Sequence, residues 1–169
     1  MARDDDAFEA FVAARSHELM RTAVLLTRDR GHAEDLLQTA LVKAYRRWNR
    51  IDGDDRYPYV RRILVTTAAS WRRLRVTQEI VSLPAYEAST PDATEAFADR
   101  HRMAAALGTL PPRMRAVLVL RYVEDLSEAG TAELLGCSVH TVRSQTVRGL
   151  ARLRVVLGAA APSIVLEEC

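Results

Sequence analysis

The side chains with the clearest potential for chemistry lie between Leu126 and Arg148. A stripe of basic, polar and small apolar residues recurs there at positions i, i+3, i+4, i+7 and i+8, the spacing of one helix face. The stripe consists of His140, Arg143, Ser144, Val147 and Arg148. Arginine can hydrogen-bond to guanine edges or phosphates, a hydroxyl can bond to either, and a small apolar group can contact the methyl of thymine. The segment therefore predicts a helix that reads the major groove of DNA.

Three small residues predict how this helix is held. Ser127 and Ser138 can each cap the start of a helix, and Gly136 can adopt the left-handed turn that ends the first one. The buried side of the second helix is marked by Val139, Val142, Thr146, Leu150 and Leu153. We expect a helix-turn-helix at about residues 127–154. The alternative is a helical hairpin whose basic face is only solvated.

The composition favours helices. Of the 169 residues 49% are hydrophobic, and 7 glycines and 6 prolines are too few for a turn-rich β fold. Long periodic runs of alanine, leucine and arginine predict an all-α fold. The two cysteines and four histidines are scattered, so we expect no disulfide framework, no metal site and no cofactor.

The chain shows no targeting signal. It begins Met-Ala-Arg-Asp-Asp-Asp, with no apolar segment after it, so a signal peptide is not expected. No run approaches the roughly 18 apolar residues that a membrane-spanning helix needs. We therefore expect a protein that is not membrane-inserted and that works in the reducing environment of the cytoplasm.

Charge divides the chain into blocks. Residues 1–75 carry a net charge of +4, residues 76–101 a net charge of −4, and residues 102–169 a net charge of +2. The acidic block has little apolar material to bury, which is typical of a flexible segment. We expect two small helical domains, 1–75 and 102–157, joined by a flexible acidic linker at 76–101 that includes the start of the next helix. A tail follows at 158–169.

The third helix of the first domain is expected to be a basic surface. No acidic residue occurs between Asp55 and Glu79, whereas a solvated face usually carries both signs. The polar residues off its apolar face are Arg61, Arg62, Thr66, Arg72 and Arg73. Such a surface suits nucleic acid or another polyanion. The helices expected before the helix-turn-helix lie at about residues 5–27, 32–48, 58–74, 92–108 and 113–123.

Three motifs in this order resemble the extracytoplasmic-function (ECF, group IV) sigma factors of bacterial RNA polymerase, which belong to the sigma-70 family. His32–Trp48 resembles the polymerase-binding helix of the family, and Pro58–Arg73 resembles its promoter-melting helix. Leu110–Tyr122, with Leu126–Leu153, resembles the domain that binds the −35 element. The likeness extends over residues 7–157.

The resemblance implies a factor that does no chemistry but gives core RNA polymerase its promoter specificity and helps to open the duplex. Its partners would be core polymerase, promoter DNA and an anti-sigma factor, with no small-molecule substrate. Contacts with the clamp helices of the largest polymerase subunit would come from Asp35, Leu36, Gln38, Thr39 and Lys43. Contacts in the −10 region would come from Asn49, Tyr57, Arg61, Arg62, Thr66, Arg72 and Arg73. Contacts with the −35 element would come from His140, Thr141, Arg143, Ser144, Gln145, Val147 and Arg148.

Four residues depart from the usual pattern of the family. Thr66 stands where many members carry asparagine, and Gln145 replaces a common basic residue, which would change the preferred bases. Thr131 replaces a large aliphatic residue, and Gly130 lies in the first helix of the helix-turn-helix. Glycine in a helix interior costs about 1 kcal/mol relative to alanine. We therefore expect a less rigid module than usual.

Three other functions fit the sequence less well. A stand-alone helix-turn-helix regulator would leave residues 32–75 without a role, and it would bind DNA without polymerase. A helical adaptor with no nucleic-acid role would leave the acid-free basic stretches at 56–75 and 134–166 unexplained. An enzyme is not expected, because no glycine-rich phosphate loop, paired catalytic carboxylates or nucleophile constellation is present.

Overall fold

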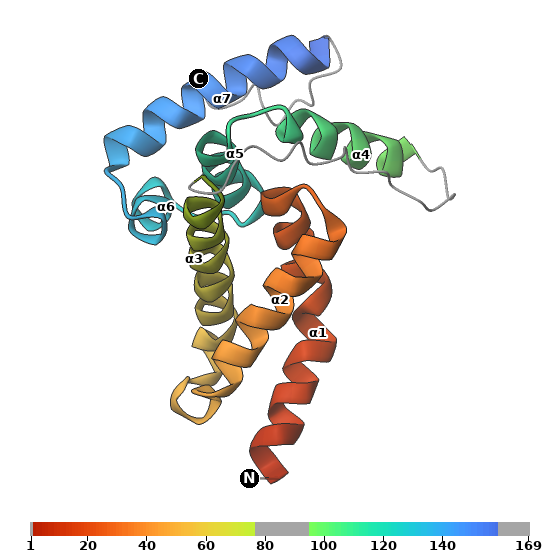
Figure 1. Cartoon of the computed structure of the whole chain (residues 1–169), viewed down its shortest axis with the longest axis vertical. Coiled ribbons are helices and arrows are strands. Elements are labelled where there is room, and N and C mark those ends of the chain that lie inside the picture. Colours follow the sequence, from red (N-terminus) through yellow and green to blue (C-terminus); the bar gives the residue numbers. More distant parts are fainter. Residues whose placement is uncertain (1, 77–94, 159–169) are drawn as a thin grey trace. The chain divides into compact units, whose positions relative to one another are not determined.

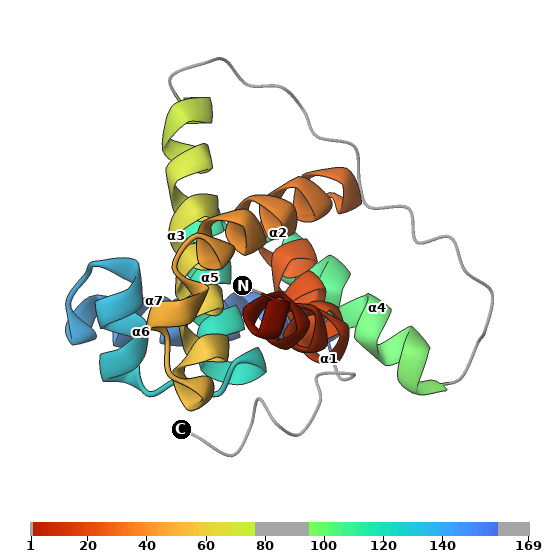
Figure 2. The same cartoon turned by 90° about the horizontal axis from the view of Figure 1, so that it is seen from below.

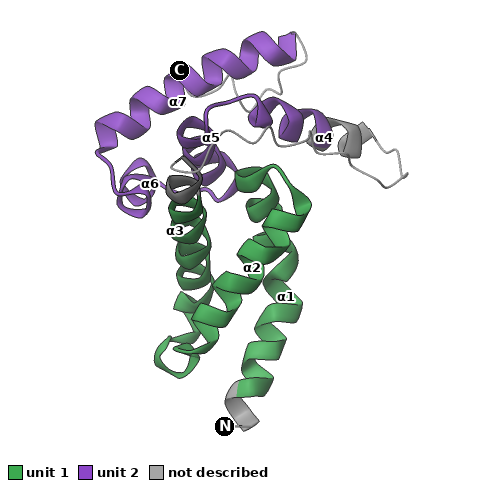
Figure 3. Ribbon diagram, in the orientation of Figure 1, with its two compact units in different colours: residues 1–85 green, residues 86–169 purple. Residues whose placement is uncertain are grey.

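The computed structural model describes residues 2–76 and 95–158, and within these ranges all regular secondary structure is helical (Figure 1). This confirms the predicted all-α fold. The chain divides into two compact units, residues 1–85 and 86–169 (Figure 3). Each unit has its own helices and its own packing, and each is described by itself below.

The first unit contains three long helices and two short 3₁₀ turns. Its elements are α1 (Ala2–Thr27), α2 (Arg30–Tyr45), η1 (Trp48–Arg50), η2 (Gly53–Asp55) and α3 (Arg56–Val76). The three long helices pack against one another, as the two views show (Figure 1 and Figure 2). Their shared core contains Leu19, Ala23, Ala33, Leu36, Leu37, Ala40, Ala44, Trp48, Val60 and Leu64.

The break between α1 and α2 begins where it was predicted but is shorter. Arg28 has a left-handed backbone, with a φ angle of 66°, and it ends α1. Asp29 then caps α2, because its Oδ1 accepts a hydrogen bond of 2.7 Å from the backbone nitrogen of His32. The helix starts at Arg30 rather than at His32, since the carboxylate of Asp29 supplies the cap.

Trp48 lies at the centre of the aromatic packing in the first unit. It is 1% exposed, and its ring centroid lies 5.0 Å from that of Phe8 and 4.9 Å from that of Phe11. On another side the guanidinium carbon of Arg56 lies 4.6 Å from the ring centroid of Trp48. The prediction that one helix continues to Trp48 is wrong, because α2 ends at Tyr45 and the chain tightens into η1, which carries the indole into the core.

The second unit contains α4 (Glu95–Gly108), α5 (Pro112–Leu118), η3 (Val119–Val123), α6 (Glu128–Leu135) and α7 (Val139–Leu157). The long helix α7 contacts α4, α5 and α6. One part of the core joins Val117 of α5, Ala132 of α6 and Val142 of α7. Helix α7 is therefore held by three other helices of its own unit.

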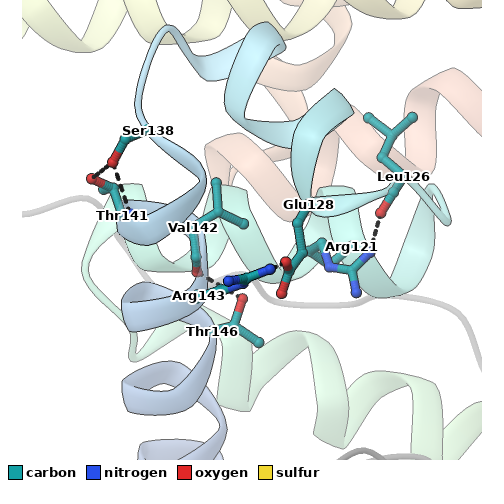
Figure 4. A network of polar contacts seen from close by, with 8 residues as sticks. All are labelled: Arg121, Leu126, Glu128, Ser138, Thr141, Val142, Arg143 and Thr146. Atoms are coloured by element: carbon teal, nitrogen blue, oxygen red, sulfur yellow. Dashed lines mark hydrogen bonds and ion pairs between the residues drawn. The ribbon is translucent and has the colours of Figure 1, made fainter.

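The segment predicted as one helix at 113–123 is α-helical only as far as Leu118. Its last five residues form η3, a π-helical turn, in which the backbone nitrogen of Glu124 bonds to the carbonyl of Val119 at 3.1 Å. The side chain of Arg121 donates to the carbonyl of Leu126, just before α6 (Figure 4). The wider turn therefore ends the α5 segment and leads the chain into the helix-turn-helix.

Two predictions fall mainly outside the described residues. Most of the expected linker at 76–101 and most of the tail at 158–169 lie there, although α4 begins at Glu95 within the linker range. None of the helices in the described ranges combines the length and apolar character needed to cross a membrane.

Candidate nucleic-acid interface and polymerase-binding face

The helix-turn-helix forms as its capping residues predict. The Oγ of Ser127 accepts a hydrogen bond of 3.0 Å from the nitrogen of Gly130, and the Oγ of Ser138 accepts one of 3.1 Å from the nitrogen of Thr141. Gly136 has a φ angle of 63° and ends α6 in the left-handed conformation. Local chemistry thus specifies the start of both helices and the turn between them.

Gly130 is better placed than the sequence predicted. It lies in the first turn of α6, and its backbone nitrogen is the group that Ser127 caps. The cost of glycine in a helix is one of backbone entropy, and it was expected for a helix interior, whereas Gly130 lies in the first turn. The expected lower rigidity of the module stays a prediction.

The buried side of α7 agrees with the predicted apolar spacing. Val142, Leu150 and Leu153 are buried, and Val139 and Thr146 are half-buried. The hydroxyl of Thr146 donates a hydrogen bond of 2.9 Å to the carbonyl of Val142, so a polar side chain is accommodated at the edge of this side. The opposite side of α7 remains for the expected DNA contacts.

The structure brings the predicted −35 residues together on α7. His140, Arg143, Val147 and Arg148 are exposed, and Val147 keeps 64% of its surface although it is apolar. Ser144 and Gln145 are half-buried at the edge of this stripe. An exposed valine between arginines suits a surface that meets both base edges and phosphates.

Thr141 differs from the other predicted −35 residues. Its backbone nitrogen is capped by Ser138, and the hydroxyl oxygens of the two residues lie 2.9 Å apart. Its side chain is thus already engaged at the start of α7 (Figure 4). A contact between this hydroxyl and DNA would compete with its hydrogen bond to the hydroxyl of Ser138, whereas the cap itself uses the backbone nitrogen.

The exposed stripe on α7, which we call the reading stripe, contains one ion pair that was not predicted. The Nε of Arg143 donates to the Oε2 of Glu128 across 2.7 Å, which joins α7 to α6 (Figure 4). The 15-residue separation follows no helical period, so sequence spacing gives no signal for it. The only available hint was an acidic residue directly after the cap Ser127.

The predicted polymerase contacts all lie on α2, and all but one of them reach the surface. Asp35 and Gln38 are exposed, and Thr39 is half-buried. Lys43 is also exposed, but its Nζ donates a hydrogen bond of 3.2 Å to the hydroxyl of Thr67 on α3. Lys43 therefore connects two helices as well as carrying charge on this face.

Leu36 is the exception, because its side chain is 0% exposed and belongs to the core. Helix α2 packs against both α1 and α3, so its buried side is wider than a single apolar stripe and includes both Leu36 and Leu37. We therefore assign Leu36 to the core and remove it from the expected contact surface. Val42, which the sequence reading did not select, is 56% exposed on the same helix.

The predicted −10 residues surround the start of α3. Asn49 is exposed in η1, and Tyr57 is half-buried, with the guanidinium carbons of Arg15 and Arg61 lying 5.2 Å and 5.7 Å from its ring centroid. Arg15 comes from α1, and its position beside Tyr57 could not be inferred from spacing. Arg62 is exposed.

The other three −10 residues lie further along α3, Thr66 in its middle and Arg72 and Arg73 near its end. Thr66 is exposed, and its hydroxyl donates a hydrogen bond of 2.8 Å to the carbonyl of Arg62 in its own helix. The side chains of Arg72 and Arg73 lie outside the described residues. The described ranges hold no cluster of three His, Cys, Asp or Glu side chains arranged to bind a metal ion.

Comparison with known proteins decides the family. A family model described as sigma-70, region 4 matches residues 100–153, which contain the helix-turn-helix. The chain is 43% identical over 149 residues to the RNA polymerase sigma-E factor of Streptomyces avermitilis, covering 87% of this chain and 83% of that protein. It is 32% identical over 146 residues to the ECF RNA polymerase sigma factor SigL of Mycobacterium tuberculosis, covering 82% of each.

The chain belongs to the ECF sigma factors of the sigma-70 family. This confirms the family predicted from the three motifs, and a stand-alone helix-turn-helix regulator is not favoured. Members of this family are transcription initiation factors, not catalysts.

Solved structures agree with the fold of this ECF sigma factor. The sigma factor RpoE of Bartonella quintana, in complex with the anti-sigma factor NepR, matches with a TM-score of 0.72 and 21% identity, covering 91% of this chain and 98% of that one. CnrH, in complex with the cytosolic domain of CnrY, matches with a TM-score of 0.63 and 23% identity, covering 93% of this chain and 91% of that one.

Proposed function

We propose that this ECF sigma factor binds core RNA polymerase and directs it to start transcription at particular promoters. The observation that carries the proposal is the exposed stripe on α7, presented by a helix-turn-helix whose two helices are both capped. In this proposal residues 1–75 bind core polymerase and the −10 region, and residues 102–157 bind the −35 element. The acidic segment 76–101 joins the two, and 158–169 is a tail.

Helix α2 supports the proposed contact with polymerase. The exposed side chains of Asp35 and Gln38 and the nearby charge of Lys43 lie on a helix whose other side is fixed in the core. The clamp helices of the largest polymerase subunit are the proposed partner of this face. The exposed Val42 would add apolar contact area beside these polar groups.

The start of α3 supports a role in the −10 region. The segment from Asn49 to Tyr57 contains most of η1, all of η2 and the first residues of α3, and the same helix then carries the positive charges of Arg61 and Arg62. Taking a base out of the stack costs a few kcal/mol. Capture of the base by this segment, with the DNA backbone attracted to the arginines, would offset that cost.

The solved relatives support a second kind of partner. Both were determined with a bound protein, NepR in one case and the cytosolic domain of CnrY in the other. We propose that an anti-sigma protein likewise covers the exposed faces of this chain when its promoters are silent. Once released from such a protein, the chain would act beside the polymerase in the cytoplasm. It would neither catalyse a reaction nor use a small-molecule substrate.

Run-off transcription with core polymerase tests the main proposal. The template is a promoter library randomised at its −35 and −10 elements, and the productive templates are sequenced. We expect a defined pair of elements to be enriched only when the chain is present. The same DNA is then tested for binding with the chain alone, because a stand-alone regulator would bind it as tightly without core polymerase, and that result would contradict the proposal.

A further inference from the structure

Two arginines on the reading stripe of α7 are held differently. Arg143 donates from its Nε to the Oε2 of Glu128 across 2.7 Å, and Figure 4 shows the two side chains reaching toward each other from α7 and α6. Arg148, five residues further along α7, makes no hydrogen bond or ion pair within the part of the chain that the structure describes. The helix-turn-helix therefore holds Arg143, but not Arg148, in place before DNA is bound.

This ion pair contributes little to the fold. The side chains of Arg143 and Glu128 are 66% and 34% exposed, and ion pairs open to solvent add little to stability. The same two helices are already joined by the buried contact of Val117, Ala132 and Val142. A role in binding accounts better for the pair than a role in folding.

The atom used in the pair suits base recognition. A guanidinium group has five N–H donors in a rigid plane, and the bond to Glu128 uses the one on Nε. The two terminal nitrogens remain, and they form the fork that matches the O6 and N7 acceptors of guanine. Anchoring Nε also restricts the side-chain torsions, so less entropy is lost when the fork meets a base.

The carboxylate of Glu128 has a second effect, on the charge of the reading stripe. Glu128 places a negative charge beside Arg143, and this charge repels phosphates. An arginine that is already paired with a carboxylate gains less from a phosphate, which carries no sequence information. The pairing therefore favours contact of Arg143 with a base edge over contact with the DNA backbone.

We infer that Glu128 is a specificity-determining positioning residue, which holds Arg143 so that its terminal nitrogens read one base of the upstream promoter element, most favourably a guanine. The inference rests on the proposed function, because it requires that α7 reads promoter DNA. Glu128 itself acts through Arg143.

The test compares base preference in transcription by the reconstituted holoenzyme. Templates carry an upstream element randomised one position at a time, and the variants are Glu128→Gln, Glu128→Asp, Arg143→Ala and the double variant Glu128→Gln/Arg143→Ala. Glu133→Gln, at an exposed position of the same helix, is the matched control because it removes the same charge. Core affinity and thermal unfolding are measured for each protein.

Arg143→Ala should lower the preference at one base position by about 5- to 150-fold, the range that a bidentate base contact contributes. Glu128→Gln should lower the preference at that same position by about 2- to 5-fold, the most that an ion pair open to solvent contributes, and should have no further effect in the Arg143→Ala background. Glu128→Asp should resemble Glu128→Gln, since its carboxylate is one methylene shorter. Glu133→Gln should keep the wild-type preference.

Two results would overturn the inference. One is a Glu128→Gln holoenzyme that transcribes all templates more or less strongly but keeps the wild-type preference. The other is full restoration of the preference by Glu128→Asp, since charge at the start of α6 would then suffice. A wild-type holoenzyme with no promoter preference would instead contradict the proposed function.

Discussion

Gly149 on α7 lies so close to Leu118 on α5 that a Cβ atom built on the glycine would be 2.9 Å from the Cδ1 of the leucine. The same atom would lie 2.9 Å from the Cγ of Met114. Side chains in a packed core have little room to move aside, so a glycine allows this close approach of the two helices. The position of α7, which carries the proposed reading stripe, therefore depends on the absence of a side chain at Gly149.

Gly149→Ala should destabilise the packing of α7 on α5. Alanine favours a helix over glycine by about 0.5–1 kcal/mol, but overpacking a core costs about 1–3 kcal/mol. We expect the free energy of opening of α5 and α7 to fall by about 1 kcal/mol in native-state hydrogen exchange. The control is Gly31→Ala in α2, where the nearest contact of a Cβ would be 3.4 Å, and it should be neutral or stabilising. A Gly149→Ala variant as stable as the wild type would contradict this packing argument.

Thr131→Val should stabilise the helix-turn-helix. Thr131 is 0% exposed, and its hydroxyl has no hydrogen-bond partner within the described ranges. A buried polar group left unpaired costs about 1–3 kcal/mol, and valine keeps the shape of threonine without the hydroxyl. We expect the free energy of unfolding of the second unit to rise by about 1 kcal/mol, measured by hydrogen exchange in α6.

The matched control is Thr22→Val in α1. Thr22 is also 0% exposed, but its hydroxyl donates a hydrogen bond of 3.3 Å to the carbonyl of Glu18. Its replacement should leave stability unchanged or lower it, because a satisfied group is lost. If Thr131→Val and Thr22→Val changed the free energy of unfolding equally, the hydrogen bonding of the hydroxyl would not explain the effect.

Gly136→Ala tests the turn of the helix-turn-helix. No atom lies within 4 Å of a Cβ built at this position, so the substitution meets no steric contact and acts through the backbone alone. The left-handed conformation costs a residue with a Cβ about 1–2 kcal/mol, and we expect a loss of that size in thermal unfolding. Asparagine adopts this conformation more readily, so Gly136→Asn should lose less. Equal losses for the two variants would argue against a backbone origin.

Features that depend on neighbouring residues were predictable from the sequence. The caps at Ser127 and Ser138 and the left-handed Gly136 each follow from the chemistry of one or two residues, and the structure contains all three. The buried side of α7 was predictable because apolar residues recur at the helical period. These features were enough to predict the helix-turn-helix.

Features that depend on tertiary packing were not predictable. Leu36 was predicted as a polymerase contact but is buried, because α2 contacts both α1 and α3. The π-helical turn η3 depends on hydrogen bonds near the entry to α6, and the period of the sequence carries no sign of them. The pairing of Arg143 with Glu128 likewise requires the crossing of two helices, which spacing alone cannot reveal.

The two proposed surfaces should be separable by mutation. Asp35→Arg reverses the charge of an exposed residue on α2 and should weaken binding to core polymerase. Arg148→Ala removes an exposed side chain from the reading stripe of α7, and loss of a base contact costs about 1–3 kcal/mol at the position it reads. It should weaken recognition of the −35 element and leave core affinity unchanged. Core affinity and promoter-dependent transcription are measured for both variants.

Each variant has a control in its own unit. Glu9→Arg makes the same reversal of charge at an exposed position of α1, and it should keep core affinity because it lies outside the proposed contact face. Arg113→Ala removes an exposed arginine from α5, outside the stripe on α7, and it should leave the preference among upstream sequences unchanged. If Arg148→Ala lost core binding, or if Asp35→Arg kept full core affinity and transcription, the assignment of the two surfaces would be wrong.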